Sequence, residues 1–194
     1  MPLPLSLLFL LLISCAAAAR KHDAPQDLVR SSCVHASYPN LCLRTLSSYA
    51  GPANTPKELA QAAVNVSLSR ARRVSNFLKS QVTSPVEIQN GSAARKRQRV
   101  ALSDCVEQMS ESVEELSETL DELKHLRVET FRFQMDNAET WVSAALTYDD
   151  TCLDGFDGVD GKLKSNVKRK ITNVARVTSN ALYMINRLDK TRGS

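Results

Sequence analysis

Side chains that could act as catalytic acids, bases or nucleophiles are spread along this sequence without forming a recognisable set. Neighbouring carboxylates occur at Glu114-Glu115, Asp121-Glu122 and Asp149-Asp150, and the three histidines stand far apart, at positions 22, 35 and 125. General acid–base catalysis needs such a group in a desolvated cleft, whereas most charged pairs on helices are solvated. The sequence also lacks a G-x-S-x-G elbow, a glycine-rich phosphate loop and an H-E-x-x-H motif. We therefore predict no catalytic residue, no cofactor and no enzymatic activity.

Residues 1–19 have the features of a targeting segment. They carry no charged side chain, and an apolar run over residues 7–13 is followed by small residues that end at Ala19. This pattern is typical of a secretory signal peptide, and it is too short for a comfortable membrane span. We expect a single domain over residues 20–194 that is secreted to the extracellular space and is not attached to a membrane after cleavage.

Four cysteines remain after removal of this segment: Cys33, Cys42, Cys105 and Cys152. In an oxidising compartment four cysteines form two disulfides, with three possible pairings. The spacing favours Cys33–Cys42 and Cys105–Cys152. A zinc site is a poor alternative, because the sequence has no C-x-x-C and its histidines form no ligand pair. We predict no metal site.

Two N-glycosylation sequons fit the same compartment. They are Asn65-Val66-Ser67 and Asn90-Gly91-Ser92, of which the second has the Asn-Gly pair typical of an exposed turn. Asn65 and Asn90 are therefore the candidate glycan acceptors.

Composition and periodicity predict an all-α protein. Aromatic residues make up 5% of the chain and only six glycines occur, which disfavours a turn-rich β-protein. Apolar residues instead recur at alternating steps of four and three in four segments. These segments are a helix from Thr55-Pro56 to just before Ser84-Pro85, one over 92–126, one through 138–152 that ends at Asp154-Gly155, and one over 161–189. We predict an up-and-down four-helix bundle over 55–191, preceded by a helical hairpin at 24–50.

The pattern also predicts which side chains face the bundle core. In the second long helix these are Leu102, Val106, Met109, Val113, Leu116, Leu120 and Leu123, and in the third Ala138, Trp141, Ala145, Tyr148 and Cys152. Glu107, Glu111, Glu114, Glu118 and Asp121 then lie opposite the apolar seam and form a negative outer face. From periodicity alone a solvated helix face is the simpler interpretation, and a docking surface for a partner is the alternative.

The net charge of +4 is too small to indicate a nucleic-acid partner. A basic run, Arg95-Lys96-Arg97 followed by Arg99, has no interleaved aromatic residues, which argues against nucleic-acid binding. An acidic polysaccharide is the alternative polyanion for this run.

Several motifs are familiar as a set. They are Ser32-Cys33-Val34, Tyr38-Pro39-Asn40-Leu41-Cys42, Ala101-Leu102-Ser103-Asp104-Cys105, Trp141-Val142-Ser143-Ala144-Ala145-Leu146-Thr147 and Asp150-Thr151-Cys152-Leu153-Asp154-Gly155-Phe156. With four cysteines in register, the mature chain resembles the plant invertase and pectin methylesterase inhibitor family over essentially its whole length. The resemblance implies a secreted four-helix bundle with an N-terminal hairpin. It also implies that the first cysteine pairs with the second and the third with the fourth.

Members of this family bind a carbohydrate-active enzyme and block its substrate cleft. The stretch from Trp141 to Thr147 resembles the pectin methylesterase branch, and the Pro-Lys-Phe tripeptide associated with invertase inhibitors is absent. The resemblance therefore favours a monomer that binds pectin methylesterase one to one, with acidic pectin as a further candidate ligand. Inhibition of cell-wall or vacuolar invertase is one alternative, and a non-inhibitory cell-wall or lipid-binding helical protein is another.

The same resemblance suggests four contact residues. Counted from the third and fourth cysteines, they are Glu111, Glu114, Thr151 and Asp154. Family members carry aspartate at the first two positions, so glutamate here keeps the charge and extends the reach. The outward placement of both glutamates on the predicted helix agrees with a role in binding.

Overall fold

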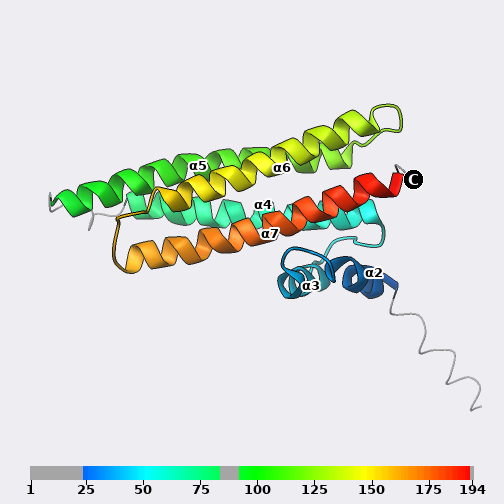
Figure 1. Cartoon of the computed structure of the whole chain (residues 1–194), viewed down its shortest axis with the longest axis horizontal. Helices are drawn as coiled ribbons and strands as arrows, with labels where there is room; N and C mark the ends of the chain where they lie inside the picture. The colour runs from blue at the N-terminus through cyan, green and yellow to red at the C-terminus, as the bar shows by residue number, and fades with distance from the viewer. Residues whose placement is uncertain (1–23, 84–91, 193–194) are drawn as a thin grey trace, which may run out of the picture.

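The computed structural model describes residues 24–83 and 92–192, and in these residues it contains helices and no strands (Figure 1). The helices are α2 (Ala24–Cys33), α3 (Pro39–Ser47), α4 (Pro56–Val82), α5 (Ala93–Lys124), α6 (Phe131–Asp154) and α7 (Lys162–Arg192). The predicted all-α class is confirmed. The predicted signal peptide lies outside the described residues.

The four long helices form a bundle in which sequence neighbours also pack side by side. α5 packs against α4 and α6, and α7 closes the bundle by packing against α6 and α4. The α2–α3 hairpin lies against α4 and α7, on the side away from α5 and α6 (Figure 1). Both disulfides have the pairing that the spacing favoured, Cys33–Cys42 within the hairpin and Cys105–Cys152 between α5 and α6.

The helix boundaries follow local signals. Thr55 is the N-cap of α4, where its Oγ1 accepts a hydrogen bond from Glu58 N–H (3.1 Å), and Pro56 is the first helical residue. α6 ends at Asp154, but Gly155 stays right-handed (φ −57°). The left-handed turn comes at Gly158 (φ 75°), a conformation that glycine adopts without strain.

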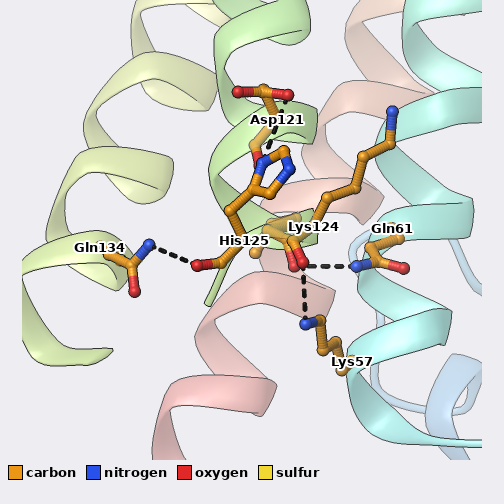
Figure 2. A network of polar contacts seen from close by, with 7 residues as sticks. Lys57, Gln61, Asp121, Lys124, His125 and Gln134 are labelled. Carbon is orange, nitrogen blue, oxygen red and sulfur yellow. Dashed lines mark hydrogen bonds and ion pairs between the residues drawn. The ribbon is translucent and has the colours of Figure 1, made fainter. Parts of the chain in front are cut away.

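The carboxyl end of α5 is held by side chains from two neighbouring helices (Figure 2). Lys57 Nζ and Gln61 Nε2 of α4 donate to the carbonyls of Lys124 (3.1 Å) and Leu123 (2.8 Å). Gln134 Nε2 of α6 donates to the carbonyl of His125 (3.0 Å). These bonds satisfy carbonyls that have no partner within the helix, which explains why α5 stops at Lys124 instead of continuing to the predicted residue 126.

The apolar seams predicted for α5 and α6 need a correction. On α5, Val106 and Val113 are only half-buried, and on α6 the same holds for Trp141 and Tyr148. Beside these four positions the buried residues are Cys105 and Ser112 on α5 and Val142 and Asp149 on α6. The other predicted seam positions are buried as predicted: Leu102, Met109, Leu116, Leu120 and Leu123 on α5, and Ala138, Ala145 and Cys152 on α6. Both helices are thus rotated so that small side chains face each other. The Cys105–Cys152 bridge, with its Cα atoms 4.5 Å apart, requires this close approach.

Asn180 of α7 fastens the hairpin to the bundle. Its Oδ1 accepts from Tyr38 N–H (2.8 Å), and its Nδ2 donates to the Tyr38 carbonyl (3.1 Å). Asn180 is 4% exposed, so removal of its amide would leave both backbone groups of Tyr38 without this partner.

We expect Asn180→Ala to lower the free energy of unfolding by about 2 kcal/mol, because part-buried polar groups lose their hydrogen bonds. Urea denaturation would measure the loss. Asn166→Ala, at an exposed position of the same helix, is the matched control and should change stability by less than about 0.5 kcal/mol. Equal effects of the two substitutions would contradict the role assigned to Asn180.

Candidate functional site

The predicted contact residues lie on two adjacent helices. Glu111 and Glu114 belong to α5, while Thr151 and Asp154 belong to the last turn of α6. α5 and α6 are antiparallel, and the Cys105–Cys152 bridge sets their register. At a rise of about 1.5 Å per residue, this register puts Thr151 within roughly two turns of Glu111 along the bundle axis. The structure thus brings the two halves of the predicted site to neighbouring helices.

The acidic side chains of α5 form a band of negative charge, in which Asp121 Oδ1 lies 3.4 Å from Nδ1 of His125. Glu107, Glu114, Glu118 and Asp121 are exposed, as the periodicity predicted, but Glu111 is half-buried. Among the described residues neither Glu111 nor Glu114 forms an ion pair. Burial raises the pKa of the neighbouring Glu115, and the charges of Glu114, Glu111 and Glu118 raise it further. The local potential is therefore negative and favours a partner with cationic groups.

The two residues of α6 offer acceptor atoms. Thr151 is exposed, and its Oγ1–H donates to the Thr147 carbonyl (2.8 Å), so its oxygen lone pairs remain available to a donor on a partner. Asp154 is exposed at the carboxyl end of the helix. A carboxylate gains nothing from the helix dipole at this end, where the dipole is negative.

Beneath this face lies a buried acid that the sequence analysis placed among solvated carboxylates. Asp149 is 0% exposed; its Oδ1 accepts from Ser112 Oγ (3.0 Å), and its Oδ2 has no hydrogen-bond partner among the described residues. Burial raises the pKa of Asp149 to about 8, against a smaller opposing effect of the Ser112 hydrogen bond. The carboxyl is therefore protonated at neutral pH. The sequence does contain a signal for this burial. Asp149 follows Ala145 by four residues and precedes Cys152 by three, so the three residues lie on one face of the helix.

The first predicted glycan acceptor has a defined environment. Asn65 lies inside α4 and is half-buried, and its Nδ2, the atom that a glycan would modify, donates to Tyr49 Oη (2.9 Å). Ser67 of the same sequon is buried. A glycan on Asn65 would have to displace this hydrogen bond. Asn90 lies outside the described residues.

Neither a metal site nor a membrane span is found among residues 24–83 and 92–192. No group of three or more His, Cys, Asp or Glu side chains there is arranged to hold a metal ion. None of the helices in that part of the chain is long and apolar enough to cross a bilayer.

A model of the plant invertase/pectin methylesterase inhibitor family matches residues 27–184. The chain belongs to this family. Because it is a family of inhibitors, membership confirms the prediction that the chain is not an enzyme.

Individual relatives support the same assignment. The chain is 50% identical over 192 residues to pectinesterase inhibitor 3 of Arabidopsis thaliana, covering 95% of this chain and 90% of that protein. It is 40% identical over 187 residues to the 21 kDa protein of Daucus carota, covering 93% of each chain. Pectinesterase inhibitor 9 of Arabidopsis thaliana is 36% identical, over 94% of this chain and 90% of its own.

A solved structure shares the fold. The crystal structure of a mutant form of a pectin methylesterase inhibitor from Arabidopsis superimposes with a TM-score of 0.62, covering 79% of this chain and 92% of that one. At 22% identity this similarity confirms the helical architecture and carries no further argument about the binding partner.

Proposed function

We propose that this chain is a secreted, monomeric inhibitor of pectin methylesterase that forms a one-to-one complex and covers the substrate cleft of the enzyme. The observation that carries the proposal is the 50% identity to pectinesterase inhibitor 3 over 95% of the chain. The predicted signal peptide at residues 1–19 supports the extracellular location.

The contact surface in this proposal is the α5–α6 face, defined as Glu111, Glu114, Thr151 and Asp154. The disulfide between Cys105 and Cys152 ties its two helices together before the partner arrives. A surface that is already ordered loses less conformational entropy on association. The carboxylates of this face also predict that association slows and weakens as salt is added.

The α5–α6 face is tested by Glu111→Ala, Glu114→Ala and Thr151→Ala combined. We expect the inhibition constant for a plant pectin methylesterase to rise at least about tenfold, since central contacts of this kind contribute about 1–2 kcal/mol each. The matched control, Asp27→Ala with Glu129→Ala and Ser165→Ala, removes two exposed acids and one exposed hydroxyl outside the two helices. It should leave inhibition unchanged.

The possible results separate the alternatives. Unchanged inhibition by a folded triple variant would reject the α5–α6 face as the contact surface. The proposal that pectin methylesterase is the target would still stand. Assay of an invertase beside the esterase separates the two targets, because the unaltered protein should inhibit only the esterase. Inhibition of neither enzyme would reject the proposed function in favour of a non-inhibitory helical protein.

A further inference from the structure

A basic groove runs between the hairpin and the bundle, where α3 lies against α4 and α7. Its main cavity has a volume of about 700 Å³. Six cationic side chains from three helices line it: Arg44 of α3, Arg70 and Arg73 of α4, and Arg169, Lys170 and Arg176 of α7. No acidic residue is among the residues that line this cavity.

The charge of these groups is not balanced from within the protein. Where the described residues supply hydrogen-bond partners, these are neutral: Arg70 Nη1 donates to Asn173 Oδ1, Arg73 Nη2 donates to Ser69 Oγ (3.0 Å), and none of the six forms an ion pair there. Burial lowers the pKa of Arg70, and the guanidinium groups of Arg73 and Arg44 lower it further. The cationic side chains therefore lie close together despite their mutual repulsion, and a bound anion would reduce that repulsion.

The groove is longer than a small anion needs. A second cavity of about 370 Å³ shares Arg70 and Arg73 with the first and reaches Tyr49. A third, of about 320 Å³, shares Arg44 and Arg176 with it and reaches Tyr38. The three cavities therefore adjoin one another through four shared arginines, and a tyrosine lines each of the two smaller cavities. The Arg176 guanidinium lies over the Tyr38 ring, 5.4 Å from its centroid.

We propose that this groove binds a polyuronate chain, the carboxylate-bearing form of pectin. Guanidinium groups present paired N–H donors that match the two oxygens of a carboxylate, so several arginines along adjoining cavities suit a polymer that carries one carboxylate per sugar. The choice of polymer rests on the proposed function, because hydrolysis of methyl esters by pectin methylesterase produces these carboxylates. Since the groove is built from α3, α4 and α7 and the α5–α6 face from the other two long helices, one molecule can hold polymer and enzyme together.

The test uses the secreted chain and a fully de-esterified galacturonate oligomer of about ten sugars, with its methyl-esterified counterpart as a neutral probe. Arg44→Gln, Arg73→Gln and Arg176→Gln combined alter three exposed groove residues. The matched control, Lys96→Gln with Arg97→Gln and Arg99→Gln, removes the same charge from the exposed basic run of α5. Calorimetry should show salt-sensitive binding of the acidic oligomer, at least about tenfold weaker in the groove variant and within about twofold of the original in the control.

Three results would overturn the groove proposal: no binding of the acidic oligomer by the unaltered protein, equal losses in the two variants, or binding of inorganic phosphate as tight as that of the oligomer. Binding of each variant to immobilised pectin methylesterase, measured without pectin, separates this proposal from the previous one. The groove variant should keep its affinity for the enzyme. A protein that binds the oligomer but not the enzyme would reject the proposed function and leave the polymer site standing.

Discussion

Replacement of Asp149 with asparagine is expected to remove most of the dependence of stability on pH between about 4 and 8. The carboxyl of Asp149 has a pKa of about 8 in the folded protein and an ordinary value of 3.8. Between these values the folded state retains a proton that the unfolded state has released, so the free energy of unfolding falls as pH rises. At about 1.4 kcal/mol per pH unit, the total fall is of the order of 5 kcal/mol.

Asparagine keeps the shape of the protonated acid and an oxygen that can accept from Ser112 Oγ, and it does not ionise. Denaturation at a series of pH values should give a falling curve for the original protein and a flatter curve for Asp149→Asn. Above pH 8 the variant should therefore be the more stable protein. Asp150→Asn is the matched control, because Asp150 is exposed and contributes only a small part of the effect on its neighbour. Parallel curves for the original protein and Asp149→Asn would show that Asp149 takes up no proton on folding.

The second large effect is expected from removal of the bridge between α5 and α6. Cys105→Ala combined with Cys152→Ala opens a loop with a sequence separation of 47 residues. On the chain-entropy model this costs about 4 kcal/mol, because the unfolded chain gains freedom. Urea denaturation should show this loss. Inhibition should weaken as well, since the α5–α6 face is no longer held in register before docking.

The bridge of the hairpin is the internal comparison. Cys33→Ala with Cys42→Ala opens a separation of only nine residues, for which the same model gives about 3 kcal/mol. This double variant should leave the α5–α6 face ordered and inhibition nearly unchanged. A larger loss of inhibition from the hairpin pair than from the pair at 105 and 152 would contradict the assignment of the contact face.

The success of the sequence-based predictions differed among the helices for a physical reason. In α4 and α7 the apolar residues at alternating steps of four and three, such as Val64 to Leu78 and Ile171 to Ile185, are buried, as expected for this periodicity. On α5 and α6 the prediction was wrong by one position at Val106, Val113, Trp141 and Tyr148, which are only half-buried, while the other predicted positions are buried. Small residues such as Cys105 and Ser112 face the neighbouring helix, because the two helices approach closely at the bridge. Periodicity detects large apolar residues, whereas close helix contacts select small ones.

The candidate sites also differ in how far the sequence could predict them. The spacing of the cysteines and the resemblance to a family were enough to place Glu111 and Thr151 on neighbouring helices. The basic groove was not predicted, because its cations come from three helices and are separated by up to 132 positions, from Arg44 to Arg176. The basic run that the sequence displays, around Arg97, is a different surface.

Local patterns in the amino-acid sequence determined the number of long helices, the start of α4 at Thr55-Pro56 and the favoured cysteine pairing, since each depends on residues close together or on a few spaced thiols. Only the tertiary structure decided the rotation of α5 and α6, the burial of Asp149 and the meeting of six cations from α3, α4 and α7. These features depend on distances between helices, and such distances result from the packing of side chains from several helices at once.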